Sequence, residues 1–222
     1  MGQRPDLDRV VVPIFLTNTL FWNLFKIIDM TSKKDRSPIL ADKYYHIYNR
    51  GNNFEETFRG PRDYHLFLWL IKKYISSLVE IYAYALLPNH FHILLKTTKE
   101  LKEREFGKYY ASMMIDYTRF INKREGRSGN LFLKPFKRIL IDSDEYMKRL
   151  VFYIHFNPQK HGLTNHYQNY KFSSFMAFQS ELDTLINKKD VFEIFGSKTN
   201  FNDFHTYLEE LNKLNEAQTF EF

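Results

Sequence analysis

The chain has 222 residues, of which 44% are apolar and 26% are charged. This length fits one domain with appendages, and this composition argues against a disordered, collagen-like or multi-span membrane chain. Cysteine is absent, which removes disulfides, thiolate nucleophiles and cysteine-based zinc sites. The absence fits a reducing compartment, and we expect a cytoplasmic protein.

The charge is distributed unevenly along the chain. The net charge is +6, but residues 181–222 hold nine acids and four bases, a net of −5, which leaves +11 on residues 1–180. A basic body with an acidic tail indicates an anionic partner, with nucleic acid the leading candidate. On charge alone, an ordinary solvated surface is the slightly favoured interpretation.

The N-terminal segment is apolar but interrupted. Residues 10–28 read VVVPIFLTNTLFWNLFKII, which approaches the length of a membrane span. Polar residues and Pro13 break this run, and a signal peptide would need a cleaner apolar stretch. We therefore disfavour a membrane role and treat residues 1–42 as an N-terminal extension, with Met30 as a candidate start of translation.

From residue 43 the pattern becomes regular. Alternation and helical spacing predict strands at 44–48, 80–87, 90–97 and 131–141, the last broken at Pro135, and helices from Pro61, over 101–123 and from Asp142 to the residue before Pro158. Strands 80–87 and 90–97 should form a hairpin. This order predicts an α+β fold with a small antiparallel sheet that carries helices. Residues 177–222 predict an acidic helical tail, with helices at 191–195 and 204–214.

The sharpest local feature is the sequence Pro88-Asn89-His90-Phe91-His92. Residues i and i+2 of a strand point to the same face, so His90 and His92 should present two imidazoles side by side. Neutral imidazoles suit a divalent cation such as Mn²⁺ or Zn²⁺ and can join waters around Mg²⁺. A pair of histidines that are hydrogen-bonded to nearby polar groups is the alternative interpretation.

The helix after Asp142 carries a second candidate group. Tyr153 and Asn157 are four residues apart and share a helix face. A tyrosine hydroxyl can act as a nucleophile, and an amide oxygen can bind a metal. The alternative is an amphipathic helix on which Tyr153 packs at the edge of the core and Asn157 caps the last turn.

A basic stretch rich in glycine and phenylalanine forms the third candidate. Such a stretch can hold phosphates and stack on unpaired bases, although a solvated helix end and hairpin would look similar. Between residues 119 and 138 only Glu125 opposes seven basic residues: Arg119, Lys123, Arg124, Arg127, Lys134, Lys137 and Arg138.

Together these features resemble the HUH-class single-tyrosine transposases, in particular the REP-associated tyrosine transposase type. The motifs that carry the resemblance span residues 43–176, in the family's order: YHIYNRG at 45–51, His90-Phe91-His92, GRSGNLFLKPFKR at 126–138, YIHFNPQKHGL at 153–163 and YKFSSF at 170–175.

The resemblance implies a ferredoxin-like catalytic domain over residues 43–176 that cleaves and rejoins single-stranded or hairpin DNA. It implies that His90, His92 and Asn157 bind Mg²⁺ or Mn²⁺. Tyr153 then attacks the scissile phosphate and forms a 5′-phosphotyrosine bond, with Tyr146 and Tyr117 as rival nucleophiles. Within such relatives the site is built by a monomer or shared in a homodimer.

Three alternatives stay open. A catalytically inactive protein that binds DNA or RNA hairpins would need the basic stretch but neither the histidines nor Tyr153. A metal-dependent nuclease would use water in place of the tyrosine. A structural α+β domain would need none of these residues. The acidic tail would either cover the basic groove or form a solvated helix.

Overall fold

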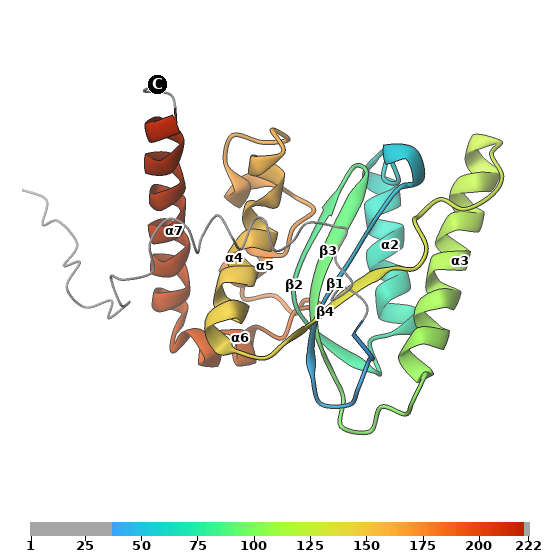
Figure 1. Ribbon diagram of the computed structural model, residues 1–222, viewed down its shortest axis with the longest axis horizontal. Helices are drawn as coiled ribbons and strands as arrows, with labels where there is room; N and C mark the ends of the chain where they lie inside the picture. The colour runs from blue at the N-terminus through green and yellow to red at the C-terminus, as the bar shows by residue number, and fades with distance from the viewer. Residues whose placement is uncertain (1–36, 220–222) are drawn as a thin grey trace, which may run out of the picture.

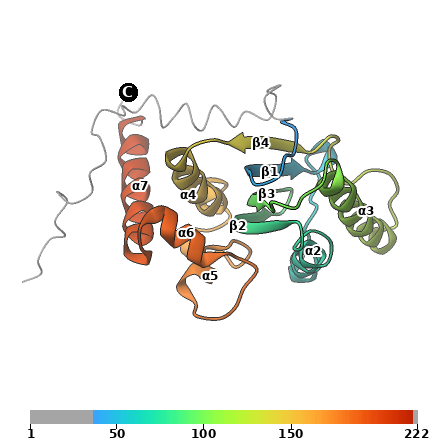
Figure 2. The ribbon, with the colours of Figure 1, turned by 90° about the horizontal axis from the view of Figure 1, so that it is seen from below.

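The computed structural model describes residues 37–219 and has three layers, with a four-stranded antiparallel sheet between two groups of helices (Figures 1 and 2). The strands lie in the order β2-β3-β1-β4, and all three pairings are antiparallel. Their bounds are β1 Tyr44–Arg50, β2 Val79–Leu87, β3 His90–Thr97 and β4 Lys137–Ile141. This order, with one helix after β1 and one after β3, is the ferredoxin-like arrangement, so the predicted α+β fold class is confirmed.

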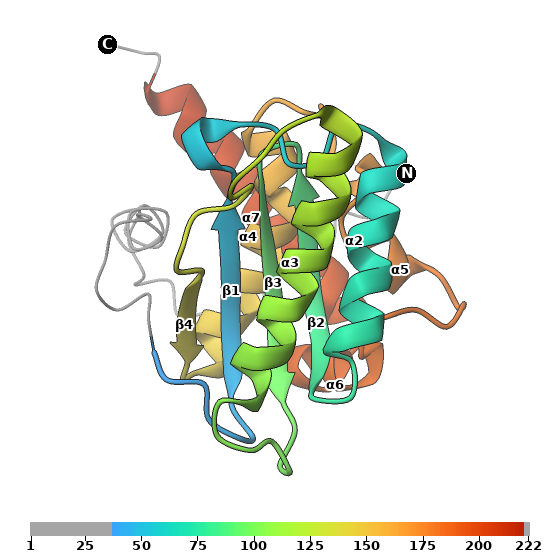
Figure 3. The ribbon, with the colours of Figure 1, turned by 90° about the vertical axis from the view of Figure 1, so that its right-hand side faces the viewer.

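Helices α2 (Pro61–Tyr74) and α3 (Glu105–Glu125) lie side by side on one face of the sheet (Figure 3). Pro61 occupies the first turn of α2, where a missing backbone N–H costs nothing, and Lys72 and Lys73 occupy its last turn, where they favour the helix dipole. The predicted apolar stripes face inward. Aromatic rings interlock between the helices and the sheet: Phe58, Phe67, Phe91, Tyr117 and Phe132.

Helix α4 (Asp144–Lys160) packs across the opposite face of the sheet. Ser143 caps its first turn by accepting a hydrogen bond from the backbone N–H of Tyr146, and Asp144 and Glu145 complement the dipole there. Since strand side chains alternate between faces, the even-numbered residues of β1 and β3 point toward α4.

The C-terminal segment folds against α4 as helices α5 (Phe175–Gln179), α6 (Lys188–Phe195) and α7 (Lys198–Thr219). A buried chain of hydrogen bonds joins these parts. His205 donates from Nδ1 to the carbonyl of Phe201, its Nε2 faces His155 Nδ1 at 3.0 Å, and His155 Nε2 contacts Ser174 Oγ at 2.8 Å. One face of the predicted tail is therefore buried, and α7 lies on the far side of the molecule from α3, so the tail does not cover the basic stretch (Figure 1).

Several predicted element boundaries differ from the structure: α3 begins at Glu105 and not at residue 101, and α7 begins at Lys198 and not at residue 204. Strand β4 comprises only Lys137–Ile141, because residues 131–136 run as a loop that contains a cis Lys134–Pro135 bond and touches β1 through a single bridge from Gly51 to Phe132. Helix α4 continues past Pro158 to Lys160. Proline removes one backbone donor, but the His161 N–H still closes the last turn on the Asn157 carbonyl.

The apolar stretch at residues 10–28 and the candidate start at Met30 lie outside the described residues. Between residues 37 and 219, none of the helices is long and apolar enough to cross a membrane.

The buried histidines make stability sensitive to acid. Burial lowers the pKa of His205 to about 4 and that of His155 well below its usual range. Below about pH 6.5 the unfolded chain binds more protons than the folded one, so the free energy of unfolding should fall by about 1.4 kcal/mol per pH unit for each histidine. Urea unfolding from pH 7.5 to 4.5 measures this slope. His205→Leu should reduce it by about one proton, while substitution of the exposed His166 should not.

Candidate active site

Two histidines of β3 lie beneath α4 at the centre of the molecule. Strand β1 pairs with β3 so that His92 stands opposite Tyr48 and His90 opposite Arg50. This register turns both imidazoles to the α4 side, as predicted, while Phe91 packs into the other face. Their ring centroids are 5.3 Å apart.

Helix α4 brings the predicted tyrosine and asparagine to these histidines. The Tyr153 ring meets His92 edge to face at 5.5 Å, and Asn157 Oδ1 lies 3.1 Å from His90 Nε2. Spacing of four residues puts Tyr153 and Asn157 on the sheet-facing side of the same helix, one turn apart. The structure thus gathers His90, His92, Tyr153 and Asn157 into one cluster.

His90 lies between two amide oxygens and cannot satisfy both. Its Nδ1 is 2.6 Å from Asn89 Oδ1 and its Nε2 is 3.1 Å from Asn157 Oδ1. Burial lowers the pKa of His90 to about 4, with the charges of His161 and Arg50 acting in the same direction, so the ring is neutral at pH 7 and carries one N–H. Because both contacts are to amide oxygens, the ring nitrogen that lacks the proton directs its lone pair at a lone pair of an amide oxygen.

A divalent cation fits this donor set. With the His90 proton on Nδ1 and donated to Asn89, the Nε2 lone pair and the Asn157 oxygen converge on one point. Neighbouring ligands of an octahedral ion with bonds of about 2.1 Å lie about 3 Å apart, close to the observed 3.1 Å. Among the described residues no group of three or more His, Asp or Glu side chains forms a metal site, so the amide oxygen would be the third protein ligand.

A third histidine, which we did not predict, supports His92. His46 of β1 is fully buried, and its Nε2 lies 2.9 Å from His92 Nδ1. This contact leaves His92 Nε2 to face the His90 side. Burial lowers the pKa of His46 to about 3 and that of His92 well below its usual range. His46 and His92 are therefore both neutral and share one hydrogen bond. A sequence signal existed, since His46 and Tyr48 share a strand face, but it could not show that His46 would meet His92.

Two further unpredicted residues border the cluster. The ring of His161 lies 4.9 Å from that of His90, and the Lys160 ammonium lies 5.5 Å from the centre of the Tyr153 ring. Burial lowers the pKa of Lys160. They lie two and three residues after Pro158, so the continuation of α4 past the proline places both side chains beside the cluster.

The geometry separates the three candidate nucleophiles. Tyr117 lies on the opposite face of the sheet, where its buried hydroxyl donates to the Thr57 carbonyl at 2.7 Å. Tyr146 lies two turns before Tyr153 on α4 and is close enough to act on the Tyr153 pKa. The Tyr153 ring packs directly against His92. Burial raises the Tyr153 pKa to about 12, and the neighbouring Asn157 amide acts against that rise.

The seven predicted basic residues do not form one surface. Arg119, Lys123, Arg127 and Lys134 line a single cavity between α3 and residues 130–136. Lys137 pairs with Tyr48 in β4 and so belongs to the α4 face, whereas Arg138 lies over the Phe136 ring and donates to the Ser37 carbonyl.

Arg124 serves the fold. It makes a two-pronged ion pair with Asp63, whose side chain is completely buried, and a further pair with Glu125. The guanidinium holds the pKa of Asp63 below its usual range against the effect of burial. The Asp63 carboxylate balances this charge, so Arg124 has a structural role, and its contact with DNA stays a prediction.

These features define a ferredoxin-like domain in which two strand histidines lie beneath a tyrosine-bearing helix. A solved structure with this fold is a REP-associated tyrosine transposase bound to a REP hairpin: the TM-score is 0.56, the identity is 21%, and the match covers 72% of this chain and 93% of that one. A scan of family models and a search of curated proteins return no match. The resemblance drawn from the motifs is confirmed at the level of the fold.

The assignment of Arg124 can be tested against its neighbour Lys123. Arg124→Ala should lower the free energy of unfolding by at least ~2 kcal/mol, because it leaves the buried Asp63 carboxylate without its partner; the partial exposure of Arg124 keeps the loss below that of a fully buried pair. Lys123→Ala should change stability by less than about 0.5 kcal/mol. Chemical unfolding measures both. Equal losses in the two variants would contradict the assignment.

Proposed function

We propose that this protein is a DNA strand transferase that acts on single-stranded or hairpin DNA through Tyr153. The observation that carries the proposal is the convergence of Tyr153, Asn157, His90 and His92 at one point between α4 and the sheet. The likeness in fold to a transposase bound to a hairpin supports the class of substrate.

The chemistry assigned to Tyr153 is attack of its hydroxyl oxygen on a phosphodiester. A bond forms between that oxygen and phosphorus, the bond to the 3′ oxygen breaks, and the departing oxygen leaves as a 3′-OH. The phenol must lose its proton, which a raised pKa opposes. The nearby Lys160 ammonium favours the phenolate by electrostatic attraction, and rejoining reverses these bond changes.

His90, His92 and Asn157 would hold a divalent cation, Mg²⁺ or Mn²⁺. When bound, such a cation polarises the scissile phosphate and orients it. With a cation bound, His90 would donate its Nδ1 proton to Asn89 Oδ1, and His92 would donate its Nδ1 proton to His46 Nε2. In this tautomer both Nε2 atoms would be available as ligands.

A covalent adduct tests the proposal. Wild-type protein incubated with labelled hairpin DNA that carries a single-stranded flank, in Mg²⁺ or Mn²⁺, should yield a protein–DNA species that survives denaturing electrophoresis. Tyr153→Phe should abolish this species while DNA binding persists, because only the nucleophilic oxygen is lost. Tyr117→Phe is the matched control and should retain the adduct.

The other outcomes separate the alternatives. An adduct that survives Tyr153→Phe and disappears in Tyr146→Phe would move the nucleophile. Cleavage without any adduct would indicate a nuclease that uses water. Salt-sensitive binding with neither cleavage nor adduct by wild type would favour the inactive hairpin-binding protein.

The support given by His46 to His92 predicts a second effect. His46→Phe removes the hydrogen-bond acceptor of His92 Nδ1 while it keeps a ring of similar size, so the metal concentration for half-maximal adduct formation should rise about 10- to 100-fold. His46→Gln, which restores an acceptor, should rescue part of this loss. A metal titration measures both, and an unchanged midpoint in His46→Phe would contradict the role.

A further inference from the structure

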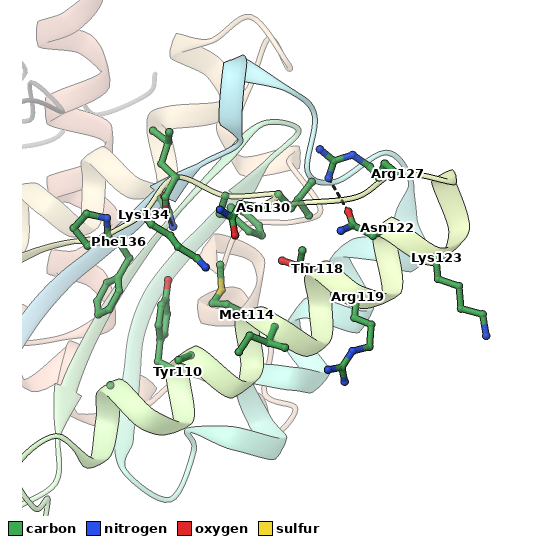
Figure 4. Close-up of a pocket in the computed structure, with 18 residues that line it drawn as sticks. Tyr110, Met114, Thr118, Arg119, Asn122, Lys123, Arg127, Asn130, Lys134 and Phe136 are labelled. Atoms are coloured by element: carbon green, nitrogen blue, oxygen red, sulfur yellow. Dashed lines mark hydrogen bonds between the residues drawn. The ribbon is translucent and has the colours of Figure 1, made fainter.

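A large cavity lies on the side of the sheet away from the histidines. It has a volume of about 850 Å³ and is bounded by one side of α3 and by residues 130–136 (Figure 4). This volume is within the range of sites that bind small molecules. None of the residues discussed as catalytic lines it, so it calls for an explanation of its own.

The walls of the cavity are apolar and partly aromatic. Met114, Ile115 and Leu133 line it together with Phe136. The Phe136 ring packs on Tyr110 with centroids 4.2 Å apart and is only half-buried, so it remains accessible for contact. Side chains of this kind suit a flat ring, since bases stack on aromatic residues in a manner that tolerates any sequence.

Polar side chains line the same space. The Tyr110 side chain is 3% exposed, and its buried hydroxyl makes no hydrogen bond of ordinary geometry, although Asn49 on the cavity wall lies close enough to act against the rise in its pKa; in Figure 4 this hydroxyl is directed into the cavity. The half-buried Thr118 and the exposed Asn130 also line the cavity. A ligand with its own donors and acceptors would satisfy them, as the edges of a nucleobase do.

The rim of the cavity is basic. Arg119, Lys123, Arg127 and Lys134 surround it, and no acidic residue lines it. Arg127 is ion-paired with Glu55 and bonded to Asn122, and the largely exposed Arg119 is ion-paired with Asp116. Among the described residues Lys123 and Lys134 make no ion pair, so they supply the unbalanced positive charge of the rim. An apolar, aromatic interior beside these cations is complementary to a nucleotide, whose base is flat and whose phosphate is anionic.

The cavity also has a defined position relative to the histidines. Asn49, on its wall, stands opposite Phe91 in the sheet, and Phe91 separates His90 from His92. The two sites therefore lie on opposite faces of the same strands. A base in the cavity cannot belong to the phosphate at the histidines, and must come from another part of the same DNA.

We propose that this cavity binds an unpaired base from the single-stranded flank of the DNA hairpin, with the base against Phe136 and within reach of the Tyr110 hydroxyl. The proposal rests on the proposed function for its class of ligand. It adds a second point of contact, one that reads an unpaired nucleotide away from the scissile phosphate.

Photocrosslinking locates the base. Hairpin DNAs with 5-iodouracil at one flank position at a time would be irradiated in complex with the full-length protein, and the crosslinked peptides mapped by mass spectrometry. We expect one flank position to crosslink to Tyr110 or Phe136. Crosslinks confined to residues outside the cavity would overturn the proposal.

Affinity supplies the second test. Tyr110→Phe should weaken binding of the flanked hairpin about three- to tenfold, and Met114→Trp, which fills the cavity, should weaken it at least tenfold. Neither should change binding of a hairpin without the flank. Tyr109→Phe, on the exposed side of the same helix, is the matched control, and thermal melts would show that each variant folds.

The outcomes distinguish this proposal from the proposed function. If wild type forms the Tyr153 adduct but both cavity variants bind the flanked hairpin as wild type does, the cavity proposal fails alone. If no hairpin binds, both fail. Stronger binding of a matched RNA flank than of the DNA flank would also overturn the assignment to DNA.

Discussion

The pairing of β1 with β3 at the centre of the sheet is the constraint on which the site depends. It places His46 against His92 and sets His90 beside the end of β1, all on the side that α4 covers. A slip of one residue in this register would turn every one of these side chains to the opposite face. The aromatic packing of Phe91 with Phe67 and Phe132 opposes such a slip, because it ties the odd-numbered residues of β3 to α2 and to the 131–136 loop. The core on one face thereby fixes the chemistry on the other.

Burial then decides the protonation of the site. The imidazoles of His46, His90 and His92 lie under α4, where their pKa values are lowered. A neutral imidazole carries one N–H, and the hydrogen bonds around the ring determine which of its two nitrogens is protonated. Asn89 and His46 occupy the Nδ1 side of His90 and His92, respectively. The lone pairs left over face Asn157 and the space beside Tyr153. Burial keeps the histidine rings neutral and so able to bind a cation. The same burial raises the Tyr153 pKa, so the hydroxyl loses its proton less readily.

Much of this arrangement could be predicted from the sequence. Alternating and helical periodicities gave the strands and helices of residues 44–160, and spacing of two and of four residues identified the histidine pair and the Tyr153–Asn157 pair. The neighbours of these pairs could not be predicted, because His46 meets His92 through strand pairing between residues that are 46 positions apart. The partner of Arg124 could not be predicted for the same reason. Arg124 looks like its neighbours in sequence, and only the fold reveals the buried carboxylate of Asp63 beneath it. The loop at 131–136 looked like a strand because Leu131, Phe132 and Leu133 form a short apolar run, although this segment meets Gly51, just after β1, through one bridge.

That loop connects the two faces of the molecule. Its first residues close the aromatic core through Phe132, its middle lines the cavity through Lys134, and it leads into β4, whose Lys137 stands opposite Tyr48 on the histidine side. One short segment thus touches both the space suited to a base and the edge of the site suited to a phosphate. A nucleic acid strand that engaged both would follow this segment around the edge of the sheet, where β4 is short and has no further neighbour among the described strands. The basic residues of the 119–138 stretch are likewise divided between these two faces, with Arg119, Lys123, Arg127 and Lys134 at the cavity and Lys137 on the histidine side.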